Sequence, residues 1–284
     1  MDFSNSFTVT PMNMRVELKA GEVSEGDIQI AIPADAKDNF HYVVSVSSYG
    51  VLGEDYKVDF LTETERTQIV DWINIDNPKG EIQPNKSVKV HYRVTVPDNA
   101  PAGGQYAAFL ITSDPQYDTS EGVAVSSVLE IASILYAEID GELTHDGELL
   151  SNNVPGFVTS IPFEVSAGFS NDGNVHETAR IQVTVKDVLG GNIVYPRGED
   201  SGIIEEVIMP GTRRVVTRTI NGTAPLGIYD VTQSITYMGT DNLAHSTMMI
   251  CPIWFIGLLF VTIGIITMAI VYRIKLIRNR RQVY

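Results

Sequence analysis

Most of the chain before residue 250 alternates between apolar and polar residues, with breaks at Gly, Pro, Asn and Asp. In segment 87–97 the apolar residues occupy every second position, and the residues between them are Lys89, His91, Arg93 and Thr95. Successive side chains of a β-strand point to opposite faces, so this period predicts a strand with one buried face and one solvated face. The pattern recurs at Ile28, Ile30 and Ile32, at Ala179, Ile181, Val183 and Val185, and at Tyr229, Val231, Gln233, Ile235 and Tyr237.

Short strands separated by turn residues favour an all-β fold built from β-sandwiches. A weak repeat divides the chain, because an Ala-Pro pair followed by Gly and Tyr occurs at Pro101 and again at Pro225, 124 residues later. We interpret each copy as a corner whose Tyr packs while its hydroxyl stays in water. The pattern predicts two tandem immunoglobulin-like β-sandwiches, at 1–139 and 140–247, with the last strand of the first at Val123–Tyr136 and a linker at Leu243–Thr247. The best helix candidate before residue 248, Thr62–Trp72, is short.

The C-terminal region predicts one membrane anchor. Segment Cys251–Tyr272 has no charged residue and would span roughly 33 Å as a helix, enough to cross a bilayer core. We assign the transmembrane helix to 248–272 and a basic tail to 273–284. The anchoring residues are predicted to be Trp254 and Tyr272 near the helix ends and, in the tail, Arg273, Lys275, Arg278, Arg280 and Arg281.

Charge sets the expected orientation. The net charge is −15 and the tail carries five positive charges, so the rest of the chain carries −15 − 5 = −20. The positive-inside rule places the tail in the cytoplasm and the acidic part outside the cell. Such an acidic exterior argues against nucleic acid as a partner and against electrostatic adhesion to anionic lipid or wall polymers. Export requires a signal, and MDFSNSFTVTP has neither a basic nor an apolar signal region, so we expect a signal peptide to precede residue 1.

Enzymatic motifs are missing from the sequence. The five histidines are scattered without metal-ligand spacing, and no nucleophile elbow, P-loop or dinucleotide fingerprint occurs. The single cysteine, Cys251, leaves no internal disulfide, which is more typical of bacterial than of animal surface proteins. We therefore expect a non-enzymatic protein with no required cofactor.

Two kinds of binding residue are candidates. Asp114, Asp118 and Glu121 supply carboxylate oxygens of the kind calcium prefers, although they do not form an EF-hand. Asn171, Asp172 and Asn174 are also rich in oxygen, but Asn-Asp-Gly-Asn equally suits a tight turn. Aromatic residues near predicted strand ends could grip a glycan or a peptide, although most tyrosines of a sandwich are half-buried. They are Tyr49 and Tyr56, and above all Trp72, Tyr106 and Tyr117.

Several short motifs occur in an order that resembles the bacterial WxL-interacting cell-surface proteins. They are Phe7–Pro11, Ile28–Ile32, Trp72-Ile73, Val96-Pro97 and Ala100–Gly104 in the first half, and Phe169–His176 and Asp187–Gly191 in the second. The basic-tailed helix completes the layout. The resemblance implies a first domain that binds peptidoglycan, a second that binds a host surface, and neighbouring WxL proteins as partners. It transfers no contact residues to this chain.

The sequence thus supports two hypotheses. The leading one is a single-pass cell-membrane protein whose extracellular domains bind a cell-wall polymer or another surface protein, as an adhesin or scaffold. The other is a structural subunit of a larger membrane or surface-layer complex, with its helix packed against other membrane helices.

Overall fold

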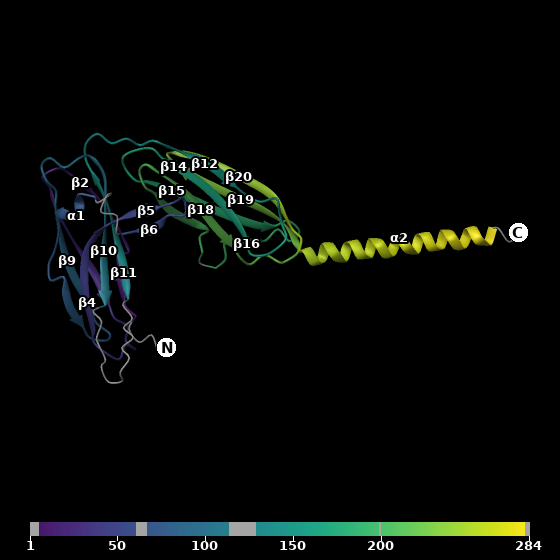
Figure 1. Cartoon of the computed structure of the whole chain (residues 1–284), viewed down its shortest axis with the longest axis horizontal. Helices are drawn as coiled ribbons and strands as arrows, with labels where there is room; N and C mark the ends of the chain where they lie inside the picture. The colour runs from purple at the N-terminus through teal and green to yellow at the C-terminus, as the bar shows by residue number, and fades with distance from the viewer. Residues whose placement is uncertain (1–5, 61–66, 114–128, 199, 282–284) are drawn as a thin grey trace. The chain divides into compact units, whose positions relative to one another are not determined.

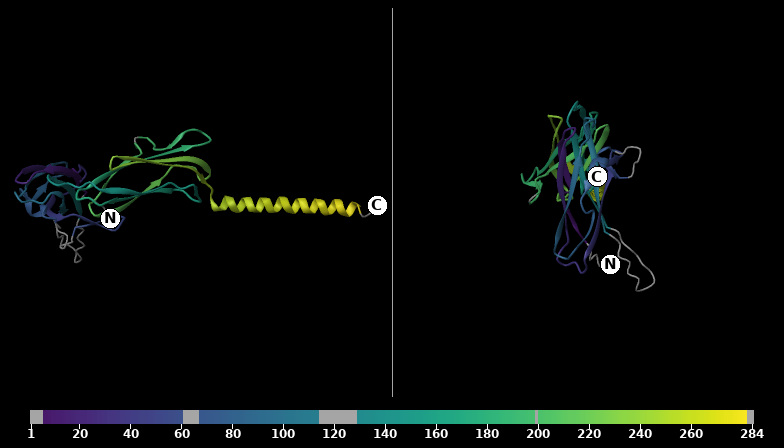
Figure 2. Two further views of the ribbon diagram at one scale, coloured as in Figure 1. Left: turned by 90° about the horizontal axis from the view of Figure 1, so that it is seen from above. Right: turned by 90° about the vertical axis from the view of Figure 1, so that its left-hand side faces the viewer.

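The computed structural model describes residues 6–60, 67–113, 129–198 and 200–281, with side chains up to residue 275. It is 56% strand and 11% helix, which confirms the predicted all-β class. The chain divides into two compact units. Unit 1 comprises Met1–Gly147, Ser170–Glu177 and Ile208–Arg214, and unit 2 comprises Glu148–Phe169, Thr178–Val207 and Val215–Tyr284. The chain ends in one long helix, drawn in yellow in Figures 1 and 2.

Unit 1 contains two facing sheets and a small hairpin. The first sheet has the order β1 (Thr8–Thr10), β3 (Val23–Ala31), β9 (Ser87–Thr95), β7 (Ile73–Ile75). The second has the order β2 (Asn13–Leu18), β11 (Glu130–Ile139), β10 (Gly103–Ser113), β4 (Phe40–Ser48), β8 (Lys79–Ile82). The hairpin is β5 (Gly50–Leu52) with β6 (Lys57–Asp59), and helix α1 is the single turn Ile69–Trp72.

The core of unit 1 lies between these two sheets. The ring of Tyr92 on β9 packs on Phe109 of β10, with 4.7 Å between centroids. Its hydroxyl donates to Met14 Sδ on β2 at 3.2 Å. Because Tyr92 belongs to one sheet and its two partners to the other, these contacts hold the layers face to face.

Unit 2 contributes most of a second pair of sheets. One has the order β12 (Gly147–Asn153), β14 (Phe163–Asn171), β18 (Thr212–Ile220). The other has the order β13 (Phe157–Val158), β20 (Thr240–Ile250), β19 (Gly227–Tyr237), β15 (Glu177–Asp187), β16 (Ile193–Tyr195), and β17 (Ile203–Ile208) also pairs with β15. The buried amide of Gln233 on β19 joins the sheets, since its Nε2 donates to Asn152 Oδ1 at 2.9 Å and to the Ser166 carbonyl at 3.1 Å.

The strand order of the first pair of sheets recurs in the second. In each pair of sheets, the first strand of the chain segment lies beside the first long strand of one sheet. The second strand joins the other sheet, where it runs parallel to the last strand of that sheet. These parallel pairs are β2 with β11 and β13 with β20. The repeat noticed in the sequence therefore has a counterpart in topology.

The alternating segments form strands as predicted. On β9, Val90, Tyr92 and Val94 are buried, whereas Lys89 and Arg93 are exposed. The core-facing residues predicted for β3, β15 and β19 are likewise buried. The physical cause is the same in each strand, because only one face packs against the opposite sheet.

Two boundaries differ from the prediction. Strand β20 covers the whole of Leu243–Thr247, so the predicted linker is wrong, and helix α2 runs over Ile253–Arg281 rather than 248–272. The sequence suggests a linker because His245 and Thr247, on the outer face, are polar, but the ladder with β19 continues to Ile250. Strand β11 begins at Glu130 and ends at Ile139; residues 123–128 of the predicted strand lie outside the described part.

The Tyr corners form, but their hydroxyls do not stay in water. Tyr106 and Tyr229 are each only 4% exposed. The Tyr229 hydroxyl accepts a hydrogen bond from the Ala224 main-chain N–H at 2.8 Å. Each ring packs over the glycine two residues earlier, where a Cβ would collide with it. Glycine thus lets the ring fold back onto its own strand, which buries the hydroxyl as well.

Candidate functional site

The structure does not bring the predicted binding aromatics together on a surface. Tyr106 is buried, so the prediction that it offers an exposed ring to a ligand is wrong. Its position was misjudged because it follows a turn, yet its side chain folds back over Gly104. Trp72 is half-buried at the end of α1 and packs against the core of unit 1. Tyr117, Asp114, Asp118 and Glu121 lie outside the described residues.

The Asn-Asp-Gly-Asn segment is a turn locked by its own side chains. Asn171 is fully buried; its Nδ2 donates to the carbonyls of Val175 at 2.8 Å and Ile208 at 2.9 Å, and its Oδ1 accepts from Gly173 N–H at 3.0 Å. Asn174 Oδ1 accepts from Thr144 N–H at 2.7 Å. These oxygens are occupied by main-chain donors. Over the described part of the chain, no three His, Cys, Asp or Glu side chains converge as metal ligands would.

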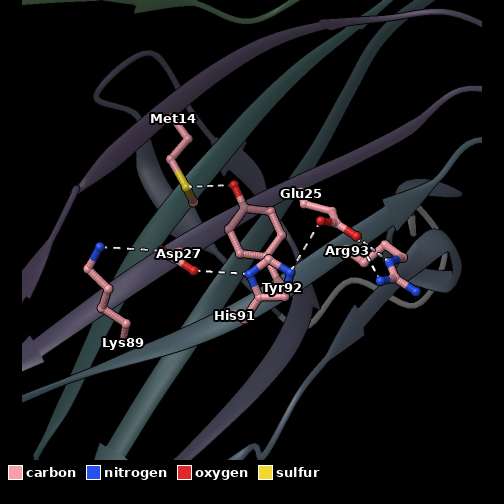
Figure 3. A network of polar contacts seen from close by, with 7 residues as sticks. All are labelled: Met14, Glu25, Asp27, Lys89, His91, Tyr92 and Arg93. Carbon is pink, nitrogen blue, oxygen red and sulfur yellow. Dashed lines mark hydrogen bonds and ion pairs between the residues drawn. The ribbon is translucent and has the colours of Figure 1, made fainter.

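A charged strip covers the outer face of strands β3 and β9 (Figure 3). Arg93 pairs with Glu25 at 2.7 Å, and Lys89 pairs with Asp27 at 3.5 Å. His91 lies between the acids, with Nδ1 3.0 Å from Asp27 and Nε2 3.6 Å from Glu25. The strip is possible because antiparallel pairing places Glu25 opposite Arg93 and Asp27 opposite His91.

The strip is nearly self-neutralising. The hydrogen bond that His91 donates to Asp27 raises the pKa of His91 above its ordinary value, and the same hydrogen bond lowers the pKa of Asp27. With His91 neutral, two acids balance two bases. Exposed cross-strand pairs of this kind contribute little individually and leave no unpaired charge to attract a partner. We interpret the strip as a solvated brace of the sheet.

An open groove of about 440 Å³ lies on the outer face of the other sheet of unit 1. Strands β2 and β11 form its floor, and the segment around the β5–β6 hairpin forms its wall. Its apolar and aromatic lining residues include Met12, Tyr49, Val58, Phe60, Ile134 and Tyr136, and Glu130 lies at its edge. The Ser47 hydroxyl donates to the Phe60 carbonyl at 2.6 Å, which fixes the wall to β4.

The aromatic rings of the groove support one another. Tyr49 meets Tyr136 edge to face with 5.8 Å between centroids, and Phe60 at 6.3 Å. The Tyr136 hydroxyl donates to the Tyr49 hydroxyl at 3.5 Å. Rigid rings with one polar edge suit an apolar or aromatic side chain of a bound segment. The described residues that line the groove include no paired nucleophile and base.

Strand β2 adds a main-chain edge to the groove. It pairs with β11 on one side and ends the sheet on the other, as far as the described residues show. In a parallel pair, alternate residues direct both main-chain groups toward the neighbour. The Met12 carbonyl accepts from Ile134 N–H of β11, and the Leu18 carbonyl accepts from the N–H of Asp140, directly after β11. The main-chain groups of the alternate residues Asn13, Arg15 and Glu17 therefore point away from β11. An extended segment could pair there.

A half-buried histidine packs behind Tyr136. The His176 ring lies 5.3 Å from the Tyr136 ring and 5.8 Å from the Tyr106 ring, all within unit 1. Burial, with a smaller contribution from the charge of Arg15, lowers the pKa of His176 to about 4. Burial also raises the pKa of both tyrosines far above their ordinary value. All three rings are therefore neutral at pH 7.

The predicted anchor residues lie on a helix with no buried residue in its apolar section. Segment Ile253–Lys275 of α2 is long and apolar enough to cross a membrane, and none of it is buried in the protein. Trp254 and Tyr272 are exposed and 18 residues apart, which corresponds to about 27 Å along a helix. Arg273 and Lys275 follow directly; the side chains of Arg278, Arg280 and Arg281 are outside the described set.

The sequence indicated only part of the groove. Tyr49 was a candidate, but Met12, Val58 and Phe60 were not. In the sequence these residues stand out only as apolar residues close to a Gly or Asp turn, as Val58 does in YKVDF, and that pattern is common. The groove arises only when the hairpin folds over the sheet, which no local pattern reveals.

Comparison with known proteins gives similarity at the level of solved structures. No protein-family model matches the chain, and no curated protein matches it. The class 5 fimbriae chaperone CfaA is 10% identical, with a TM-score of 0.40, over 85% of this chain and 99% of that one. The E. coli chaperone DraB is 11% identical, with a TM-score of 0.39, over 86% and 98%. The PapD-like domain 7 of human CEP192 is 11% identical, with a TM-score of 0.32, over 48% and 86%. Similarities this low assign no function.

Proposed function

We propose that this chain is a non-enzymatic, membrane-anchored surface protein whose strand-rich units bind another surface protein outside the cell. The observation that carries the proposal is α2. An apolar section of this length with no protein packed against it needs a lipid environment to bury its side chains. The basic residues that follow it favour a cytoplasmic C-terminus, which leaves the units outside.

We further infer that the strands form two tandem immunoglobulin-like sandwiches. In such a domain, strands A, B, E and D form one sheet and C, F and G the other. The order β1-β3-β9-β7 facing β4-β10-β11 corresponds to this arrangement, and β12-β14-β18 facing β15-β19-β20 repeats it. The buried Tyr229, whose hydroxyl accepts from a main-chain N–H five residues upstream, supports the inference because tyrosine corners of this kind mark strand F.

The groove of unit 1 is the best candidate for the contact. It combines an apolar floor, a wall of aromatic rings and the free edge of β2, which together suit an extended segment of a partner protein. Main-chain pairing along β2 would supply affinity, and the pocket beside Tyr49 and Phe60 would select a side chain. The resemblance to WxL-interacting proteins predicts that the partner is a WxL protein or a wall polymer.

A second candidate function is a structural subunit of a larger membrane complex. Gly257 and Gly264 are seven residues apart and face open space, so a second helix could approach there. The hydroxyls of Thr262 and Thr267 already donate to carbonyls of α2 itself, which leaves close packing as the main attraction.

Site-specific photo-crosslinking in the producing cells separates the two candidates. A benzoylphenylalanine replaces Val58 in the groove, Val23 as an equally exposed control on β3, or Gly257 in α2. We expect one discrete protein adduct from position 58 and none from position 23. Adducts only from position 257 would favour the membrane-complex subunit. A polydisperse product from position 58 that wall hydrolases collapse would identify a wall polymer. Identical products from positions 58 and 23 would contradict the assignment of the groove.

A further inference from the structure

Unit 2 exposes apolar side chains at the end where the chain enters α2. Antiparallel and parallel pairing aligns Phe157, Met249 and Ile228 across three strands. Val188 extends the row, since its N–H donates to the Ile228 carbonyl at 3.0 Å. Cross-strand partners point to the same face, and the row lies on the outer face, because the neighbouring Met248 and Ile250 are buried in the core.

Turns beside this row add further exposed apolar residues. Leu189, at the tip of the β15–β16 turn, is 83% exposed, although its N–H is fixed by Asp187 Oδ1 at 3.0 Å. We call the whole surface the apolar end of unit 2; it consists of Phe157, Val188, Leu189, Ile193, Leu226 and Met249.

The apolar character stops within one step along the strands. The next outward-facing row is Thr247, Asp230 and Lys186, with Ile193 opposite Lys186 at its margin. In this row Thr247 Oγ1 donates to Asp230 Oδ1 at 2.8 Å. Outward-facing residues two apart are roughly 7 Å apart. Apart from Leu243 near the other end of β20, the outer face is thus polar up to a narrow band at its last row, which is the pattern expected of a surface that meets an apolar boundary.

The same end carries little charge. Segments 153–163, 187–193 and 221–228 contain one ionisable residue, Asp187, in a chain that is 19% charged and acidic. Arg197 also reaches this end, since its Nη2 donates to the Gly222 carbonyl. Elsewhere, acidic side chains would oppose an anionic surface. At the apolar end of unit 2 most of that repulsion is absent, because few acidic side chains are present.

Chain connectivity limits what can cover this surface. Strand β20 ends at Ile250 and the membrane-spanning section begins at Ile253, a separation of three residues or at most about 11 Å. Each headgroup region is roughly 5–8 Å thick. Met249, four residues before Ile253, therefore lies at most about 14 Å from the spanning section, in the headgroup layer or directly next to it, whenever α2 spans the bilayer.

We propose that the apolar end of unit 2 inserts its exposed side chains into the outer headgroup region of the bilayer that α2 crosses, and so docks unit 2 on the membrane. This inference rests on the proposed anchoring by α2. The ligand is the lipid interface, recognised by apolar contact and the low charge of this end rather than by a specific headgroup. Side chains at this depth keep one side in lipid and leave the polar row above in water.

Fluorescence quenching of the full chain in phosphatidylcholine vesicles tests the proposal. In a Cys251→Ser background, an environment-sensitive nitrobenzoxadiazole label is attached at Leu189→Cys, at Leu243→Cys or at Ile265→Cys. Leu243 is a matched control, since it is an exposed leucine near the other end of β20. Ile265 lies in the middle of the spanning section. Nitroxide lipids carry the quencher either on the headgroup or in the middle of the acyl chain.

We expect headgroup nitroxide to quench the label at 189 several-fold more than the label at 243, and acyl nitroxide to quench the label at 265. Serine at Phe157, Val188 and Leu226 together should remove most of the quenching at 189. If 189 resembles 243 while 265 is quenched, the docking proposal is wrong and the anchor stands. If the label at 189 is shielded from water but is not quenched by either nitroxide lipid, another protein covers this surface, and the docking proposal is again wrong. If 265 is not quenched, the anchoring itself fails, and docking fails with it.

Discussion

Replacing Asn171 with alanine removes the most heavily hydrogen-bonded buried side chain of the 171–174 turn. The amide makes three hydrogen bonds to main-chain groups, at 2.8, 2.9 and 3.0 Å, and it has no exposed surface. A net contribution of about 1 kcal/mol for each predicts a loss of about 3 kcal/mol. The carbonyls of Val175 and Ile208 are then left without this donor, which pushes the cost upward. For a unit of this size, the loss corresponds to a fall in Tm of about 6–12 °C.

Thermal unfolding of the full chain in detergent, followed by circular dichroism, measures this loss. Asp172→Ala is the matched control, because Asp172 lies in the same turn and is exposed; it should change stability by less than about 0.5 kcal/mol. Equal effects of the two substitutions would refute the reasoning. So would a calcium-dependent rise in the Tm of the wild type that both variants lose, because the turn would then be an ion site.

Three further predictions concern titration and packing in unit 1. The folded pKa of His176, about 4, lies below its unfolded value of about 6.5, so stability is full above pH 6.5 and falls as the pH drops toward 4. The shift corresponds to at most about 3 kcal/mol, reduced by the partial exposure of the ring, and His176→Phe should flatten this acid limb in urea titrations at a series of pH values. The pKa of His91 is raised instead, so its contribution is present below pH 6.5 and lost as pH rises through the folded pKa. His91→Ala should therefore lower Tm at pH 5 but not at pH 8; the opposite order would contradict the role assigned to Asp27. Gly26→Ala would drive a Cβ into the ring of Tyr92 and should lower the free energy of unfolding by about 1–3 kcal/mol. Gln29→Ala, on the outer face of the same strand, should leave it nearly unchanged. Similar Tm values for the two variants would show that the ring can move freely.

Alternation in the sequence predicts the strands that line the core, because one buried face leaves a period of two. Val90, Tyr92 and Val94 illustrate this. The sequence predicted half of the charged strip, since Lys89, His91 and Arg93 are the polar positions of one strand. Their partners Glu25 and Asp27 depend on the strand register, which cannot be predicted from a local pattern. Strand β20 was cut short in the prediction because His245 and Thr247 on its outer face are polar.

The groove and the apolar end of unit 2 depend on tertiary structure. Tyr49, Phe60 and Tyr136 come from separate segments, and the hairpin brings them together. Phe157 and Val188 are aligned by strands that pair across the sheet. In the sequence each is one apolar residue near a turn, which is common and carries no information on its own. Tyr106 was misread for the related reason that its burial depends on a glycine two residues away.

Cysteine accessibility in intact cells tests the membrane topology most directly. In the Cys251→Ser background, Leu243→Cys reports on the strand-rich part and Gln282→Cys on the basic tail. A membrane-impermeant maleimide should label position 243 in intact cells and position 282 only after lysis. Labelling of position 282 in intact cells, with position 243 protected until lysis, would contradict the proposed orientation and the surface role built on it.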